Sequence, residues 1–498
     1  MRYIGLAVAF AFIGLTVINL EGQGAYYDEL HQAPAAFNYL GGNYPTLNYD
    51  FLGIPILNMS YSGAIKSNIY GLYLKFVNPH FTIYSWRLTG ILFVAIALVG
   101  FYWFAGPSLP PSSAVLFGAL ILTDASILLA TRHDWGPAAL AFALRLAFLA
   151  AWLRSKYFPA GLVIGIAVFE KVSSMVLLAP LCLWLATSDD RNLRVCRATG
   201  LGFAIGVLPL LVANAGSVAM GYGFVSLSSL GVEPVERLNV SEYAFQYLSL
   251  GNGAMARSLI LGDASSSFLT WAEAILILAL LAIIIASGKR PLQLPTLMAA
   301  SYLLIGVSIY IFPKTTFVHH WLLGNPFHYA AIALALGSLN VYRKAFLVAV
   351  VVLLALRIPN LVSIEQALAS GRTSERFHPV LTRLAELAVS KSKDSVFIAA
   401  DWGAGIQVYC LGNGQDGLLY EPFSLPDPTK TTLQVLENTK KRHLYTLVTG
   451  MAPQFQDIST SILDVIANHP DWQEAPLETE FDAISTVQIR KFVRRKLP

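Results

Sequence analysis

The sequence predicts a polytopic α-helical membrane protein of about 11 spans with a small α/β domain at its C-terminus. Hydrophobic residues make up 55% of the 498 residues, and charged residues make up only 13%. Soluble domains average about 45–50% apolar and about 25% charged residues, so this chain lacks the charge that an aqueous surface needs. A mean hydropathy of +0.57 agrees with this interpretation. The α/β domain is predicted because apolar stretches end and charge rises after residue 363.

Charge and cysteine content exclude several other classes of protein. The 34 basic and 30 acidic residues leave a formal net charge of +4, which is too even for a nucleic-acid-binding protein. The 3 cysteines lie far apart and form no CxxC pair, so neither a zinc site nor a disulfide framework is expected. We therefore expect the membrane, and no nucleic acid, as a partner.

Apolar stretches of about 20 residues, the length that spans a bilayer, recur through most of the chain. They lie near 3–20, 86–105, 113–131, 137–153, 198–216, 268–287, 295–312, 320–338 and 345–363. The first stretch follows Arg2 and is followed by a poor cleavage site, so we interpret it as an uncleaved anchor rather than a signal peptide.

The stretch 159–186 is too long for one span and too short for two, and Glu170-Lys171 lies at its midpoint. Cytoplasmic loops concentrate lysine and arginine. The short basic connections fall on one side of the membrane only if this stretch is a hairpin of two short helices with Glu170 and Lys171 at its apex. These connections lie at 154–156, 191–197, 289–290 and 343–344. We therefore expect a protein of the plasma (inner) membrane with a cytoplasmic N-terminus and an outward-facing C-terminus.

This topology predicts a transmembrane domain over 1–363 and an extracytoplasmic α/β domain over 364–498. It also places a first loop, 21–85, and a second loop, 217–267, on the outer face. Runs rich in β-branched and aromatic residues predict strands in the tail. The expected strands lie at 395–400, 444–448 and 485–493, with a helix at 458–467.

Asp124 and Arg145 are among the ionisable residues that fall within predicted spans. Each lies about ten positions from the turn near 134–135, so both are expected roughly 16 Å deep at about 1.5 Å per residue. Equal depth on antiparallel neighbours predicts a buried ion pair that holds this helical hairpin together. A role toward a substrate is the alternative, because ionisable groups inside a membrane are often functional.

Several further ionisable residues are predicted to share the outer face. They are the acids Asp28, Glu29 and Asp134, the cations Lys66, Arg132, Lys171 and Lys314, and the histidines His319 and His320. Lys66 lies within 61–75, which is expected to form an amphipathic interfacial helix. Such a set suits chemistry in which a carboxylate accepts a proton and cations bind a phosphate. Each residue also has an ordinary explanation, such as contact with lipid headgroups, so the prediction depends on their shared face.

The layout resembles the GT-C glycosyltransferases, in particular the branch of the protein O-mannosyltransferases and the lipid A aminoarabinose transferases. Asp28-Glu29 resembles the acidic pair of the family's first external loop. Lys66, about twenty residues before Arg87-Leu88, resembles the lysine of a loop helix that contacts the lipid phosphate, and the Arg-Leu pair fits as well.

Two further motifs extend this resemblance over roughly residues 1–345. The glycine-rich run from Gly161 through Gly165 to Lys171 resembles the family's short span that ends in lysine. The run RHDWGP at 132–137 resembles a motif at the top of the third span in bacterial family-39-like proteins.

The resemblance implies that a sugar is transferred, with inversion, from a polyprenyl-phosphate donor to a hydroxyl group of a lipid, glycan or protein acceptor on the outer face. Asp28 would be the general base, and Glu29 would help to position it. Lys66, Lys171 and Arg132 would stabilise the leaving phosphate.

Asp134 would support these groups, and His319 and His320 would contact phosphate or a divalent metal. A His-His pair beside few acids defines no metal site, so no cofactor is predicted with a defined set of ligands.

Two alternatives stay open. A transporter or flippase of a lipid-linked sugar usually has repeated halves with interrupted spans near the midplane, and we find no second copy of the 159–186 pattern. A structural or assembly protein would not need Asp28, Lys66, Arg132 and Lys171 on one face. We therefore predict an integral-membrane glycosyltransferase of glycan biosynthesis in the cell envelope.

Overall fold

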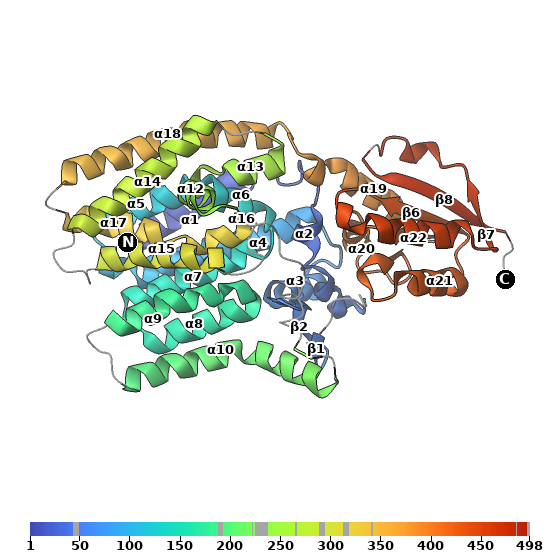
Figure 1. Ribbon diagram of the computed structural model, residues 1–498, viewed down its shortest axis with the longest axis horizontal. Helices are drawn as coiled ribbons and strands as arrows, with labels where there is room; N and C mark the ends of the chain where they lie inside the picture. Colours follow the sequence, from blue (N-terminus) through green and yellow to red (C-terminus); the bar gives the residue numbers. More distant parts are fainter. Residues whose placement is uncertain are drawn as a thin grey trace. The chain divides into compact units, whose positions relative to one another are not determined.

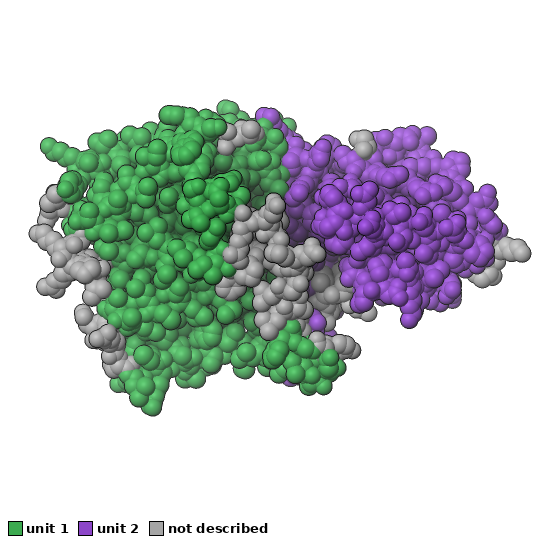
Figure 2. All heavy atoms as spheres, viewed as in Figure 1, with its two compact units in different colours: residues 1–20, 60–63, 87–370 green, residues 21–59, 64–86, 371–498 purple. Residues whose placement is uncertain are grey.

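The computed structural model describes residues 1–42, 49–187, 193–221, 223–224, 238–263, 266–287, 294–311, 318–339, 342–484 and 486–495. The chain divides into two compact units (Figure 2). Unit 1 comprises Met1–Leu20, Ser60–Gly63 and Arg87–Ser370, and unit 2 comprises Glu21–Met59, Ala64–Trp86 and Gly371–Pro498. Most of the predicted first loop therefore belongs to the same compact unit as the tail. The predicted domain division at residue 363, which assigns this loop to the transmembrane domain, stays a prediction. The predicted second loop, 217–267, lies partly outside the described residues.

Unit 1 is built from helices (Figure 1). Its helices are α1 (Arg2–Thr16), α4 (Ile83–Phe104), α5 (Pro111–Leu122), α6 (Ala125–His133), α7 (Ala138–Leu153), α8 (Tyr157–Glu170), α9 (Leu178–Thr187), α10 (Leu193–Ala219), α12 (Val240–Leu248), α13 (Ala254–Leu261), α14 (Ser267–Ser287), α15 (Leu294–Ile311), α16 (Val318–Trp321), α17 (Phe327–Ser338) and α18 (Arg343–Ala369). The first turn of α4 belongs to unit 2.

The chain is a multi-pass membrane protein, since five described helices are long and apolar enough to cross a bilayer: α4, α10, α14, α15 and α18. The pair α5 and α6, bent by 60° at its break, is a sixth candidate. Every apolar stretch predicted from the sequence is helical. The described full-length candidates are nevertheless fewer than the predicted count of about 11, because several predicted spans are short or broken helices.

The break between α5 and α6 lies at Asp124. Its backbone is extended, and its side chain accepts a hydrogen bond from the Ile127 N–H at 2.8 Å, which caps the N-terminus of α6. The predicted direct ion pair with Arg145 is wrong, because Asn325 stands between the two residues. The Asn325 amide donates to Asp124 Oδ2 at 2.9 Å, and Arg145 Nε donates to the Asn325 carbonyl oxygen at 2.6 Å.

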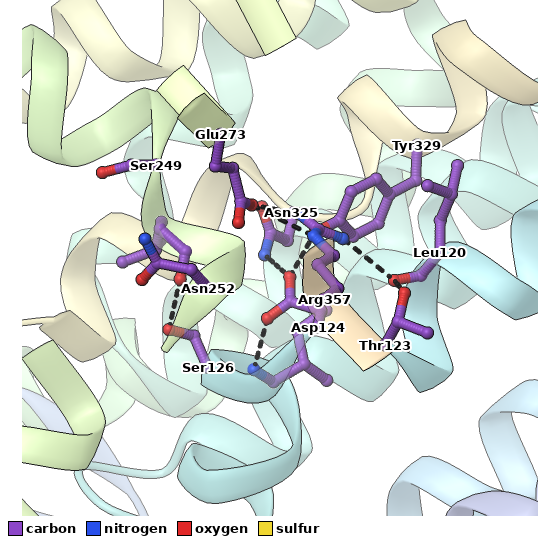
Figure 3. Close-up of polar contacts among 12 residues, drawn as sticks. Leu120, Thr123, Asp124, Ser126, Ser249, Asn252, Glu273, Asn325, Tyr329 and Arg357 are labelled. Carbon is purple, nitrogen blue, oxygen red and sulfur yellow. Dashed lines mark hydrogen bonds and ion pairs between the residues drawn. The ribbon is translucent and has the colours of Figure 1, made fainter. Parts of the chain in front are cut away.

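A second buried group lies beside Asp124 (Figure 3). Arg357 of α18 forms an ion pair with Glu273 of α14, and the Tyr329 hydroxyl of α17 donates to Asp124 Oδ2. Both members of the ion pair are about 2–3% exposed. These contacts join the four helices α6, α14, α17 and α18 in the interior of unit 1.

The stretch 159–186 forms the predicted hairpin. Tyr157, the first residue of α8, stacks on Trp184 of α9 with ring centroids 5.0 Å apart, so the chain reverses between them. Lys171 ends α8 with an extended backbone, and it pairs with Ser62 of the short strand β3 (Ser62–Gly63). The Val172 N–H donates to the Tyr61 carbonyl oxygen at 3.1 Å. The apex of the hairpin is therefore held by backbone pairing.

Glycines allow α8 to lie directly against α10. A Cβ added at Gly161 would lie 2.9 Å from the Thr199 carbonyl carbon, and one at Gly165 would lie 2.9 Å from the Gly206 Cα. Small residues spaced by four bring the backbones of membrane helices close together. The glycine-rich run that marked this span in the sequence is thus a helix-packing surface.

The loop part of unit 2 contains α2 (Tyr27–Leu30), β1 (Tyr49–Phe51), β2 (Ile54–Met59) and α3 (Ile65–Phe76). Strands β1 and β2 pair antiparallel. The predicted amphipathic helix is α3, with Lys66 and Ser67 buried on one side and Ile69, Leu72 and Phe76 exposed on the other.

The tail part of unit 2 is the predicted α/β domain. It contains α19 (Pro379–Ser390), β4 (Ser395–Ala399), α20 (Gly405–Leu411), β5 (Leu419–Tyr420), α21 (Pro428–Asn438), β6 (His443–Val448), α22 (Gln456–Ala467), β7 (Trp472–Ala475) and β8 (Gln488–Arg494). The strand order is β5-β4-β6-β8-β7, with β5, β4 and β6 parallel and β8 antiparallel to both neighbours. All five residues of β4 are buried. The three predicted strands and the predicted helix are present, although Ser485 itself lies outside the described residues.

Candidate functional site

Asp28 and Glu29 lie on α2, a single helical turn of unit 2. Glu29 is fully buried, and its carboxylate accepts a hydrogen bond from the Tyr26 N–H at 3.5 Å as part of a capping box. Asp28 is half-buried, and its carboxylate is hydrogen-bonded to the Tyr26 side chain. Burial, followed by the charge of Asp28, raises the pKa of the Tyr26 phenol, so this hydroxyl stays protonated and donates. The two acids therefore have different surroundings.

Lys66 is joined to this acidic turn by one aromatic ring. Its Nζ lies 3.7 Å from the centroid of the Trp86 ring, and Trp86 Nε1 donates to the Glu29 carbonyl oxygen at 3.2 Å. An ammonium group over an indole face is a favourable electrostatic contact. Unit 2 thus brings together three of the predicted site residues, Asp28, Glu29 and Lys66.

Lys171 belongs to a second group, within unit 1. Its Nζ donates to the Gly136 carbonyl oxygen at 2.6 Å. The Trp135 ring lies 5.0 Å from the ring of His319, which in turn lies 4.1 Å from that of His320. Burial, followed by the charge of Lys171, lowers the pKa of His319 well below its ordinary value, so this imidazole is neutral at pH 7.

Gly136 allows this arrangement. Its φ of +62° favours glycine, and a Cβ at this position would lie 2.8 Å from the His319 ring. The turn between α6 and α7 and the two histidines therefore pack around the lysine at the apex of the α8–α9 hairpin.

Arg132 and Asp134 bind backbone groups of unit 1. Arg132 donates to the carbonyl oxygens of Thr16 at 2.9 Å and Asn19 at 2.7 Å, where α1 ends. A cation is favourable at a helix C-terminus because of the helix dipole. Asp134 accepts a hydrogen bond from the Ala139 N–H at 2.8 Å, in the first turn of α7. Both residues fix the ends of helices next to the Lys171 group.

Among the residues that the structure describes, no group of three or more His, Cys, Asp or Glu side chains is arranged to hold a metal ion. Contact of His319 and His320 with phosphate or with a divalent metal stays a prediction. Lys314 lies outside the described residues. The convergence of the unit 1 and unit 2 groups on one pocket stays a prediction.

The sequence analysis assigned no role to the two tryptophans that contact these groups, Trp86 and Trp135 of the RHDWGP run. Trp86 lies directly before Arg87, and Trp135 lies directly after Asp134. An aromatic residue adjacent to a charged motif residue was the available signal, because tryptophan combines an apolar face with a hydrogen-bond donor.

Three solved structures, each with bound ligands, have a similar fold. ArnT from Cupriavidus metallidurans, bound to undecaprenyl phosphate, matches with a TM-score of 0.61 at 12% identity over 98% of this chain and 97% of its own. An oligosaccharyltransferase from Archaeoglobus fulgidus, solved with Zn and sulfate, matches with a TM-score of 0.56 at 12% identity over 91% of this chain and 69% of its own.

The third structure is the oligosaccharyltransferase AglB from the same archaeon, in complex with an inhibitory peptide and a dolichol-phosphate. It matches with a TM-score of 0.53 at 11% identity over 92% of this chain and 71% of its own. No family model and no curated protein sequence match the chain. At these identities the likeness establishes the fold.

Proposed function

We propose that this chain, which has the GT-C fold, is an integral-membrane glycosyltransferase that moves a sugar from a polyprenyl-phosphate donor to a hydroxyl acceptor on the outer face of the membrane. Two of the similar structures contain a polyprenyl phosphate, undecaprenyl phosphate in ArnT and dolichol-phosphate in AglB. The observation that supports the proposal is that Lys66 and the backbone of the turn that carries Asp28 both contact the Trp86 side chain.

Asp28 is the general base of this proposed reaction. Its carboxylate takes the proton of the acceptor hydroxyl while that oxygen bonds to the anomeric carbon of the sugar. The bond between this carbon and the phosphate oxygen breaks on the opposite face, and its electron pair stays on the lipid phosphate, so the configuration inverts. Glu29 is bound into the capping box, so its role is to hold the turn that carries Asp28.

The cations act on the leaving group. The polyprenyl phosphate gains negative charge as the glycosidic bond breaks, and a fixed cation stabilises that charge more in the transition state than in the ground state. Lys66, held over Trp86, and Lys171, held by the Gly136 carbonyl, are the two candidates. Arg132 and Asp134 support them by fixing helix ends, and the neutral His319 is a hydrogen-bonding candidate for phosphate.

The experiment supplies purified protein with polyprenyl-phosphate sugars and candidate lipid, glycan and peptide acceptors, and measures product by mass spectrometry. Asp28→Asn is expected to lower kcat by about 100-fold or more, since general-base catalysis contributes about 10²–10⁴-fold. The matched control is Asp471→Asn, which removes an exposed aspartate of the same unit and is expected to leave turnover unchanged.

Turnover of Asp28→Asn at the wild-type rate would remove Asp28 as the base. Wild-type protein that moves the lipid-linked sugar across vesicles, without forming product from any acceptor, would support the flippase alternative. The lipid or glycan that accumulates in a deletion strain identifies the sugar and the acceptor.

A further inference from the structure

The segment immediately before Asp28 is hydrogen-bonded along its whole length to the C-terminal tail of unit 2. The contacts are Gln23 Nε2 to the Arg372 carbonyl (3.4 Å), Gly24 N to the Phe377 carbonyl (2.7 Å), Ala25 N to Thr382 Oγ1 (3.4 Å), Gln407 Nε2 to the Ala25 carbonyl (3.2 Å), Arg376 Nη1 to Tyr26 Oη (3.3 Å) and Tyr27 Oη to Glu421 Oε2 (3.2 Å). Every residue from 23 to 27 therefore has a partner in the tail.

Aromatic packing reinforces this contact. The Trp402 ring lies 4.9 Å from the ring of Tyr27 and 5.6 Å from that of Tyr26, and the Phe377 ring lies 5.0 Å from that of Tyr26. A Cβ added at Gly24 would lie 2.8 Å from the His378 carbonyl carbon, so the two backbones approach as closely as glycine permits.

Trp402 is itself fixed by the sheet of the tail. Asp401, which follows β4, accepts hydrogen bonds from the N–H groups of Thr449 at 2.9 Å and Gly450 at 2.7 Å, which follow β6. The Thr449 hydroxyl donates to the Trp402 carbonyl oxygen at 2.7 Å. The loops at the carboxyl ends of two parallel strands are thus joined, and the Trp402 ring contacts the 23–27 segment.

The last step reaches Asp28. Arg376 donates to the Tyr26 hydroxyl, and the Tyr26 side chain is hydrogen-bonded to the Asp28 carboxylate. We propose that the C-terminal domain is a positioning part of the active site, which fixes the 23–27 segment and, through Arg376 and Tyr26, orients the carboxylate of Asp28. This inference rests on the proposed function, because it assigns Asp28 to the reaction.

Orientation matters because a general base acts only within hydrogen-bond reach of the proton that it accepts. A displacement of about 1 Å in a reacting group costs on the order of 100-fold in rate. Without the tail, the single turn of α2 has too few internal hydrogen bonds to hold one geometry, since isolated helices shorter than about 12 residues are marginal.

The test compares Tyr26→Phe and Arg376→Gln with wild type in the full chain. Tyr26→Phe keeps the ring contacts with Phe377 and Trp402 and removes only the hydroxyl. Both variants are expected to lower kcat by about 10- to 100-fold while KM for the lipid donor changes by less than about twofold. Arg376→Lys is expected to keep part of the rate that Arg376→Gln loses. Guanidinium added to Arg376→Gln is expected to restore part of that rate. The matched control, Arg383→Gln, removes an exposed arginine of α19 and is expected to match wild type.

The outcomes separate this inference from the proposed function. If Asp28→Asn is inactive while Tyr26→Phe and Arg376→Gln turn over at the wild-type rate, the positioning role is wrong and the proposed function stands. A loss of kcat that is accompanied by a lower melting temperature and is not rescued by guanidinium would also refute the positioning role, since this result indicates a role in folding alone. If Asp28→Asn itself is fully active, the proposed function fails first.

Discussion

The glycine contact between α8 and α10 predicts a large and local effect of adding one methyl group. At Gly161 a Cβ would lie 2.9 Å from the Thr199 carbonyl carbon and 3.0 Å from the Phe203 nitrogen. These neighbours are backbone atoms, so no side chain can turn away, and ordinary contact near 3.4 Å requires the helices to separate by at least about 0.5 Å. Overpacking of this kind costs about 1–3 kcal/mol, and rigid neighbours place Gly161→Ala at the upper end.

The same separation displaces Lys171, because that residue ends α8. We therefore expect Gly161→Ala to lower the melting temperature in detergent and also the transfer rate. Gly200→Ala is the matched control on α10, since a Cβ there meets nothing within 4 Å. Alanine favours a helix over glycine by up to about 1 kcal/mol, so this control should be unchanged or slightly stabilised. Equal melting temperatures for the two variants would refute the backbone contact.

Two further perturbations test the interiors of the units. Arg357→Met should destabilise unit 1 by about 3–5 kcal/mol because it leaves Glu273 buried without its partner. Adding Glu273→Gln to this variant should recover most of the lost stability in a melting experiment. Losses of stability that simply add in the double variant would contradict the ion pair. Burial lowers the pKa of His31 to about 4, against about 6.5 in the unfolded chain. The contribution of the neutral His31 side chain to stability is therefore complete above about pH 6.5 and falls by up to about 3 kcal/mol as the pH drops toward 4. His31→Phe should make the melting temperature less dependent on pH over this range than it is in wild type. The same dependence on pH in both proteins would disprove this linkage.

Much of the fold could be predicted because its signals are local. Each apolar run became a helix, and charge bias was enough to divide 159–186 at Lys171. The span count was less accurate, because hydropathy does not register a break such as the one at Asp124. The residues after it, 125–130, are mostly apolar and keep the average hydropathy high, although an aspartate at this point is a good N-cap.

The partners of the buried charges could not be predicted. Asp124 and Arg145 were expected to pair directly, yet the residue between them is Asn325, 180 positions further along the chain from Arg145. Helix depth follows from counting residues, whereas the identity of a facing side chain depends on a tertiary contact with no local signal. The tail contacts of residues 23–27 were missed for the same reason, since Tyr27 and Glu421 are 394 positions apart.

Position in the sequence was enough to place some of the candidate residues in the same unit. Asp28, Glu29 and Lys66 fall in the same unit, as their positions in one loop suggested. Arg132 was expected to stabilise the leaving phosphate and Asp134 to support it, and their described contacts include the ends of α1 and α7. The C-terminus of a helix attracts a cation as a phosphate does, and the N-terminus attracts an anion, so the sequence alone does not distinguish contact with a helix end from contact with substrate.

Lys171 shows why such supports matter for the proposed chemistry. Its backbone is held by Ser62, its helix lies against α10 at glycines, and its Nζ is held by the Gly136 carbonyl. Three short-range contacts leave this ammonium group little freedom to follow a substrate. A cation fixed in advance needs no reorganisation when negative charge develops on a phosphate, whereas a mobile lysine would have to be ordered during the reaction. The rigid position of α8 therefore contributes to the proposed catalysis. A weakened glycine contact between α8 and α10 should lower the transfer rate under conditions in which the protein is still folded.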